Sequence, residues 1–124
     1  MKKLSMFIVL FICAISLGAQ NVFKVVDKNP EFPGGKKALT EFIVNSIKYP
    51  KVAQECGIEG KVLVDFFINV DGSISNIKLS QGVSTSINKE ALRIVSSFPK
   101  WNPGIYKGNA VCVLRTLPII FQLN

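Results

Sequence analysis

The residues of this chain that could do chemistry are few and scattered. The sequence contains no histidine, which is the commonest general base and metal ligand in proteins. Glu41, Glu55, Glu59 and Glu90 are the carboxylates on or beside predicted helices, and each has the pattern of a routine surface residue. General acid–base catalysis needs titratable groups held within hydrogen-bond reach of the reacting atoms. These residues predict no such site, and we expect a protein that is not an enzyme.

Two further patterns are better explained by structure than by chemistry. Cys56 and Cys112 are isolated from each other, so they lack the paired spacing of a metal site. The stretch Pro33-Gly34-Gly35-Lys36-Lys37 has glycines and lysines but lacks the preceding strand and the glycine spacing of a phosphate-binding loop. A turn that opens a helix explains it. We therefore expect no cofactor and no metal.

The first twenty residues have the pattern of an export signal. Lys2 and Lys3 precede an apolar run that ends near Leu17 and is followed by small residues. The alternative is an uncleaved membrane anchor, but the run is shorter than the roughly 20 residues that a spanning helix needs. We expect a signal peptide over residues 1–20 and one domain over residues 21–124.

The charge beyond this signal is moderately basic. Without Lys2 and Lys3 the chain keeps 13 basic and 8 acidic residues, a net charge of +5. A balance of this size favours an acidic partner or an anionic surface. The lysines are spread out and do not interleave with aromatic residues, so we expect no nucleic-acid partner. Contact with a membrane is expected only if the N-terminal segment is retained.

The periodicity of the apolar residues predicts an α+β fold. A period of 3.6 residues marks three helices, over about 38–47, 50–57 and 86–98. A period of two marks three strands, over about 61–70, 73–80 and 110–123. Asp71-Gly72 is a strong hairpin signal, so the first two strands are expected to be antiparallel neighbours.

Several details of these elements are predictions of their own. Ser86 or Thr85 is expected to cap the third helix. Cys56 is expected on the buried stripe of the short second helix, as a small apolar residue. Trp101 is expected to fill the core where the third helix hands over to the last strand. Cys112 should point away from the helices, so we expect no disulfide with Cys56.

The last strand combines an apolar face with a proline. Arg115 is the single interruption of that face. Pro118 cannot donate a hydrogen bond to a neighbouring strand, so we expect at least one unpaired edge there. An unpaired edge is a template on which another strand can add.

Several spaced motifs resemble the TonB C-terminal domain family. They are YPKVAQECGIEGKVLVDFFINVDGSISNIKL, INKEALRIVSSFPKWNPG and LPIIFQLN, with a lead-in from Pro33 to Pro50 that is similar to versions from Bacteroidetes-type bacteria. The likeness covers about Glu31 to Leu123, and we expect the chain to be a stand-alone version of this domain. The positions that match family motifs are interpreted as turns, caps and a core plug: Tyr49, Pro50, Gly60, Asp71, Gly72, Trp101, Pro103 and Gly104.

This resemblance implies a fold, a compartment and a partner. The fold would be a three-stranded antiparallel sheet with helices packed on one face, preceded here by an extra N-terminal helix. The function would be protein binding in the periplasm, linked to TonB-dependent transport. An extended, TonB-box-like peptide of an outer-membrane receptor or another periplasmic protein would add to the last strand. The partner-binding residues would then be Val111, Cys112, Val113, Leu114, Arg115 and Thr116.

Some alternatives stay open at this point. Arg115 either meets an acidic residue of the partner or is a solvated charge that guards the edge against aggregation. The chain is a membrane-anchored TonB energy transducer if its N-terminal helix stays in the inner membrane. It is a structural module if its edges pair with a second copy in a homodimer. The residues between Gln20 and Phe32 reach about 40 Å at most, which favours binding over force transmission.

Overall fold

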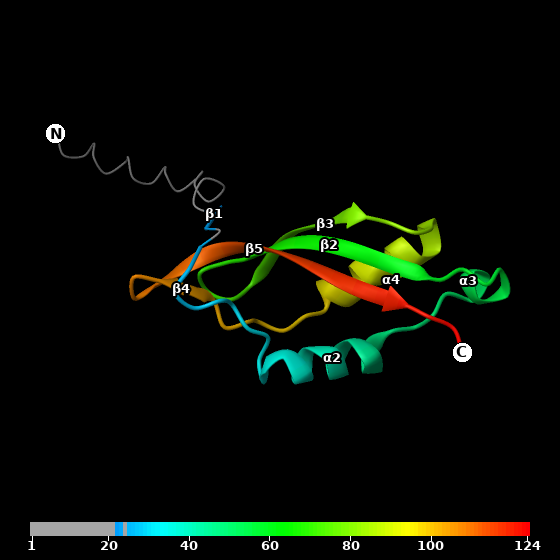
Figure 1. Cartoon of the computed structure of the whole chain (residues 1–124), viewed down its shortest axis with the longest axis horizontal. Helices are drawn as coiled ribbons and strands as arrows, with labels where there is room; N and C mark the ends of the chain where they lie inside the picture. The colour runs from blue at the N-terminus through cyan, green and yellow to red at the C-terminus, as the bar shows by residue number, and fades with distance from the viewer. Residues whose placement is uncertain (1–21, 24) are drawn as a thin grey trace.

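The computed structural model describes residues 22–23 and 25–124, so the predicted signal peptide over residues 1–20 lies outside the described residues. The elements in chain order are β1 (Val22–Phe23), α2 (Gly35–Ser46), α3 (Lys51–Glu55), β2 (Gly60–Ile68), β3 (Ile74–Gln81), α4 (Thr85–Ser96), β4 (Gly104–Tyr106) and β5 (Asn109–Phe121). The predicted α+β fold is confirmed (Figure 1). None of the described helices is long and apolar enough to span a membrane.

The strands form one sheet in the order β1-β5-β2-β3, and β4 pairs with the beginning of β5. β2 is antiparallel to both of its neighbours, β5 and β3, whereas β1 runs parallel to β5. The predicted count of three strands is therefore wrong, because β1 and β4 join the three expected ones. These two strands have only 2 and 3 residues. Segments this short cannot display a period of two in the sequence.

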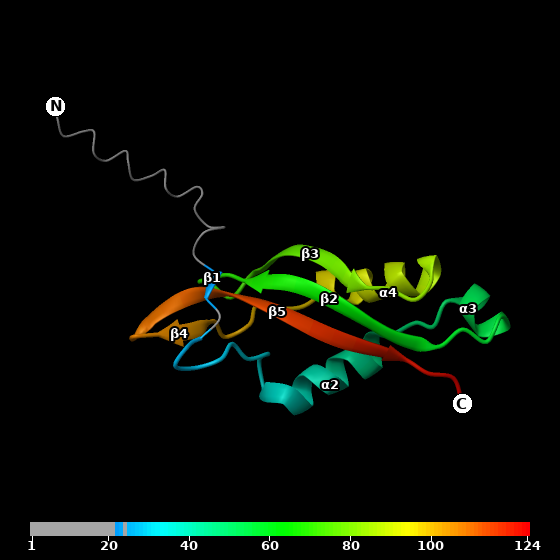
Figure 2. The same cartoon turned by 45° about the horizontal axis from the view of Figure 1, so that its top comes forward.

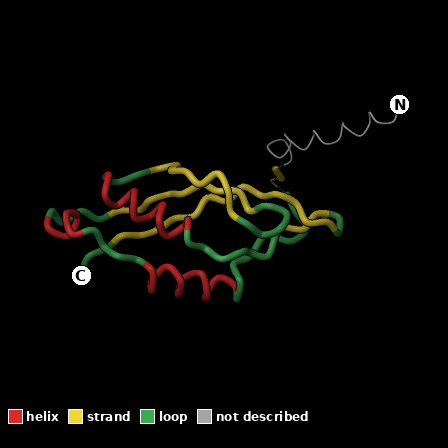
Figure 3. Tube along the Cα trace, turned by 180° about the vertical axis from the view of Figure 1, so that it is seen from behind, coloured by secondary structure: helices red, strands yellow, loops and turns green. Residues whose placement is uncertain are grey.

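One face of the sheet carries the core, and the helices cover that face. The core-facing residues of β2 and β5 alternate along each strand, as predicted: Val62, Val64, Phe66, Ile68, Leu117, Ile119 and Phe121 are all buried. α4 buries Ile87, Ala91, Ile94 and Val95 in the same cluster, and α2 adds Leu39. α2 lies beside β5 in two views (Figures 1 and 2). Seen from behind, α4 crosses in front of the strands (Figure 3).

The cap of α4 differs from the prediction. Ser84 has an extended backbone, and its hydroxyl oxygen accepts a hydrogen bond from the Ile87 N–H at 3.4 Å. Thr85 and Ser86, the predicted caps, already lie inside the helix. All three neighbouring residues carry a hydroxyl group, so the residue type alone cannot select the cap. The backbone angle at Ser84 decides it.

The short helix α3 also differs from the prediction. Cys56, expected to be buried, is exposed at the end of α3, and Val52 is 61% exposed. Only Ala53 of this helix is fully buried. A helix of 5 residues presents a single turn to the core, so its apolar stripe is too short to be covered. Cys112 is half-buried, and both thiols are free.

Trp101 fills the core where α4 hands over to β4, as predicted. It is only 3% exposed, and its ring centroid lies 5.6, 5.7 and 5.8 Å from those of Phe32, Phe66 and Phe98. The backbone N–H of Trp101 donates to the Gly72 carbonyl oxygen at 2.8 Å. A Cβ atom on Gly72 would lie 2.0 Å from the Trp101 carbonyl oxygen. The turn between β2 and β3 is thereby fixed to the Trp101 segment, and only glycine fits there.

Other positions of the resemblance also have local structural contacts. Asp71 accepts hydrogen bonds from the N–H and the hydroxyl of Ser73, at 2.9 and 2.6 Å. The Tyr49 hydroxyl donates to the Ile58 carbonyl. A Cβ atom on Gly60 would lie 2.7 Å from Val83. Pro50 is the N-cap residue of α3, half-buried Pro103 precedes β4, and Gly104 pairs with Val111.

Candidate functional site

β5 is the longest strand, with 13 residues, and its first part is covered by strands of the same chain. Residues 109–111 pair with β4 across a two-residue turn, in which Lys107 and Gly108 have φ angles of 51° and 81°. Two positive φ angles are typical of a tight type I′ hairpin. The next residues, Cys112 and Val113, pair with β1. This part of β5 has little room for another strand.

The second part of β5 is bordered by a strand on one side only. β2 pairs with residues 113–121 through nine consecutive residue pairs, without a shift of register. β1 flanks β5 on the side opposite β2 and reaches no further than Val113. Beyond that point, no strand in the part of the chain that the structure describes pairs with this side. We call residues 114–121 on this side the open β5 edge.

Pro118 indicates which backbone groups face outward. It lies opposite Leu63 in the continuous pairing of β2 and β5. Proline has no N–H, so it is tolerated in a strand where that group would face away from the neighbour. Backbone directions alternate along a strand, so the groups of Leu114, Thr116 and Ile120 then also face outward. The open β5 edge thus offers three N–H donors together with the carbonyl acceptors.

The side chains of these outward residues lie on the face of the sheet without helices. Leu114 is 44% and Ile120 is 59% exposed. The Thr116 hydroxyl donates to Asp65 at 2.6 Å, across the pair of strands. Cys112 lies on the same face, with its sulfur 3.7 Å from the Asn69 side-chain oxygen, and burial raises the pKa of its thiol. Because the thiolate is the nucleophile, this raised pKa argues against a reactive cysteine.

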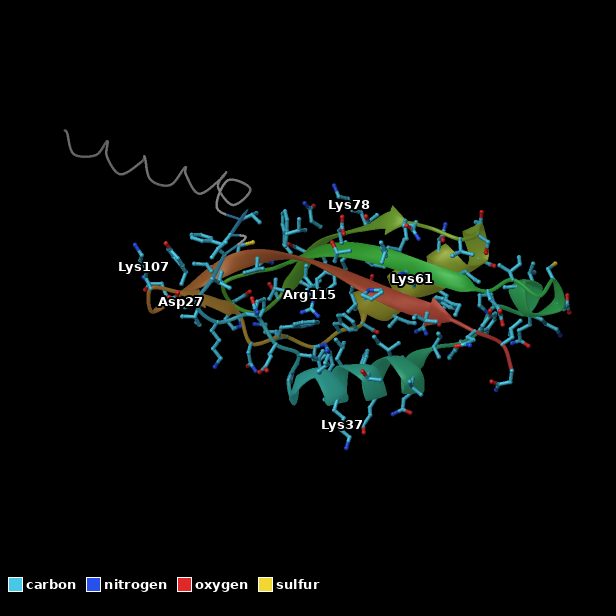
Figure 4. The ribbon with its side chains drawn as sticks, viewed as in Figure 1. Asp27, Lys37, Lys61, Lys78, Lys107 and Arg115 are labelled. Atoms are coloured by element: carbon cyan, nitrogen blue, oxygen red, sulfur yellow. The ribbon has the colours of Figure 1, made fainter. Side chains whose placement is uncertain are left out.

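Arg115 lies on the other face, among the residues that point towards the helices (Figure 4). Its guanidinium carbon lies 5.5 Å from the centre of the Trp101 ring. The side chain is half-buried, and this burial lowers the pKa of the guanidinium. Next to it, a hollow of about 380 Å³ is lined by Asn29, Pro30, Val113, Leu114 and Arg115 itself. A smaller hollow, of about 130 Å³, lies on the side of Trp101.

The structure divides the six predicted partner-binding residues into two groups. Val111 is buried and paired with Gly104, while Cys112 and Val113 pair with β1. Leu114, Arg115 and Thr116 belong to the open β5 edge. Pro118 predicted an unpaired edge at its own position, but the predicted partner-binding residues end at Thr116, whereas the open β5 edge continues to Phe121.

Comparison with known proteins identifies the family of the chain. A family model described as the Gram-negative bacterial TonB protein C-terminal matches residues 45–123. The chain belongs to the TonB C-terminal family. Protein TonB from Helicobacter pylori strains J99 and 26695 is 50% identical over 58 residues, which cover 43% of this chain and 21% or 20% of those proteins. The chain thus covers about a fifth of the length of these relatives.

Two solution structures of the Helicobacter pylori TonB C-terminal domain are also similar to the chain. They match with TM-scores of 0.54 and 0.52 and with sequence identities of 36% and 33%. The matches cover 68% and 69% of this chain, and 77% and 90% of the solved chains. The mixed fold of sheet and helices is therefore the TonB C-terminal fold.

A second polar cluster of this TonB C-terminal domain joins its helices. Glu90 is 9% exposed and accepts two hydrogen bonds from Arg93 at 2.8 Å and one from the Lys48 N–H at 2.7 Å. The Arg93 hydrogen bonds lower the pKa of this carboxyl, although burial opposes them. The Glu90 carboxylate receives its hydrogen bonds from within the fold, so we infer that this cluster stabilises the domain. Among the described residues, no group of three potential ligands could hold a metal ion.

Proposed function

We propose that this TonB C-terminal domain binds an extended peptide segment at the open β5 edge, as part of TonB-dependent transport. The partner would be an outer-membrane receptor or another periplasmic protein, and binding alone, without catalysis, would be the role of the domain. The observation that supports this most strongly is the edge itself. Nine unshifted pairs with β2 hold β5 in a regular conformation, while the opposite side of residues 114–121 carries no strand among the described residues.

The chemistry of the edge suits strand addition. In this mode main-chain hydrogen bonds supply the affinity, and alternate side chains supply the specificity. The N–H groups of Leu114, Thr116 and Ile120 are the inferred donors for the incoming backbone. The exposed side chains of Leu114 and Ile120 provide apolar contacts on one face of the added strand. The hollow between Pro30 and Arg115 gives the peptide room where β1 ends.

A proline at Thr116 tests this proposal. Thr116→Pro removes an outward donor, so we expect at least a tenfold loss of affinity for a synthetic peptide from the N-terminal segment of a TonB-dependent receptor of the same bacterium. Isothermal titration calorimetry measures it. Thr116→Val is the matched control, because it removes the hydroxyl bond to Asp65 and keeps the backbone donor. We expect its affinity to stay within twofold of the unchanged domain.

A second proline variant checks the direction of the backbone. Leu117 lies opposite Val64 and should donate inward to β2. Leu117→Pro should therefore lower the free energy of unfolding, because it removes a hydrogen bond between β5 and β2, whereas Thr116→Pro should leave the domain folded. If a folded Thr116→Pro variant binds the peptide as tightly as before, the open β5 edge is not the site.

We also propose that residues 1–20 are removed on export and that residues 21–124 act in the periplasm. The support is the short apolar run behind Lys2 and Lys3. Intact-mass measurement of the protein isolated from cells should give an N-terminus close to Asn21. A protein that keeps Met1 and fractionates with the inner membrane would contradict this.

A further inference from the structure

Resting on the proposed function, we propose that Arg115 selects partner segments that carry an Asp or Glu side chain. The recognised group is a carboxylate on the residue of the added strand that lies beside Arg115. The Trp101 ring acts as a platform that holds the guanidinium in position for this contact.

The first support is that Arg115 lacks a counter-charge. The ion pairs of the described residues join Arg93 to Glu90 and Lys100 to Asp71, and neither includes Arg115. A half-buried cation without a counter-ion loses part of its hydration. The contact with the face of Trp101 offsets only part of this loss, by about 1 kcal/mol. An incoming carboxylate would supply the missing partner.

The second support is direction. Arg115 points from β5 towards the side of α2 (Figure 4), and its side chain is half-buried. Neighbouring residues on paired strands point to the same face of a sheet. A residue of an added strand next to Arg115 would therefore project onto the face where the guanidinium lies. A planar guanidinium can donate two parallel hydrogen bonds to one carboxylate.

The third support is space at this position. The hollows of about 380 and 130 Å³ are both lined by Arg115 and by Pro30. Glu31 and Lys36 line the smaller hollow, and their opposite charges offset each other. The local excess charge is therefore that of Arg115. An Asp or Glu side chain fits both the charge and the room.

The test uses peptides whose only variable is one carboxylate. The probes are nonapeptides of alternating valine and threonine, acetylated and amidated, with one glutamate placed at each position in turn and a glutamine twin for each. We expect one register in which the glutamate peptide binds the mature domain at least tenfold more tightly than its twin. This is the size expected for a hydrogen-bonded charge pair. Fluorescence anisotropy at low ionic strength measures it.

Two variants of Arg115 and one control variant test whether Arg115 causes the preference for glutamate. In Arg115→Gln the advantage of glutamate should fall below twofold. In the matched control Lys61→Gln, which removes an exposed charge on β2 opposite Ile120, the advantage should persist. Arg115→Met keeps the alkyl packing on Trp101 and should behave like Arg115→Gln. Thermal melting confirms that each variant is folded.

The outcomes separate this inference from the proposed function. If the peptides bind but glutamate and glutamine are equivalent, or if Arg115→Gln keeps the preference, the role of Arg115 is wrong while strand addition stands. If none of these peptides binds while the receptor peptide does, the inference about Arg115 fails and strand addition stands; if the receptor peptide does not bind either, both proposals fail.

Discussion

The two outer edges of the sheet differ in regularity. Along β3, the register with β2 shifts twice, between Leu63 and Val64 and between Asp65 and Phe67, and Asn76 has a φ angle of 55°. Along β5, the pairing with β2 contains no shift. Irregular pairing bends and twists an edge, which is one way in which proteins prevent unwanted strand addition. The comparison indicates that the β3 edge is protected and that the β5 edge is suited to a partner.

The turns that precede these two edge strands should differ most in their tolerance of a side chain. Gly72, before β3, has a φ of 89° and faces the Trp101 carbonyl, whereas Gly108, before β5, has a φ of 81° and open space around it. Gly72→Ala adds a clash to the strained backbone and should cost about 4 kcal/mol of unfolding free energy. Gly108→Ala strains the backbone without a clash and should lower the unfolding free energy by about 1 kcal/mol. Urea unfolding compares them, and equal losses would contradict the close contact at Gly72.

The helices behind the two edges are joined through Glu90. α4 packs against β2 and β3, and α2 lies beside β5. Glu90 of α4 accepts a hydrogen bond from the backbone N–H of Lys48, which follows the end of α2. Glu90→Gln should lower the unfolding free energy by about 2 kcal/mol at pH 7, because charge-assisted hydrogen bonds to Arg93 are lost. Glu41→Gln, at an exposed position of α2, is the control and should change it little.

The effect of Glu90 should depend on pH in a defined direction. Hydrogen bonds from Arg93 lower its pKa in the folded state. The stabilisation is therefore fully present above the pKa of a glutamate in the unfolded chain, about 4.3, and is lost as the pH falls through the folded value. Thermal melts from pH 7 down to pH 3 should show the unchanged domain and Glu90→Gln converging at the acid end. A constant difference across this range would contradict the assignment.

The long elements of the fold could be predicted from the sequence because each repeats its pattern several times. Val62 to Ile68 and Leu117 to Phe121 alternate regularly, and both faces were assigned correctly. The features that could not be predicted rest on single residues or short contacts. β1 and β4 are too short to show a period, and Cys56 is exposed because α3 ends at the margin of the core.

The candidate site was predicted only in part, for the same reason. Pro118 indicates an unpaired edge from its chemistry alone. The coverage of Val111 to Val113 depends on pairing with β1 and β4, which no local pattern reveals. Likewise the alternation of β5 places Arg115 on the core face, but only the folded chain brings it to Trp101. Contacts between distant segments decide which half of the strand stays open.

Amide hydrogen exchange of the mature domain, followed by NMR with and without a receptor peptide, tests the central claim most directly. Without peptide, the N–H groups of Leu114, Thr116 and Ile120 should exchange faster than those of their neighbours in β5, because they face outward without a partner. With saturating peptide these three should become protected, while the outer edge of β3 should not change. Protection that appears on β3, or outward β5 amides that stay unprotected in the complex, would contradict the account.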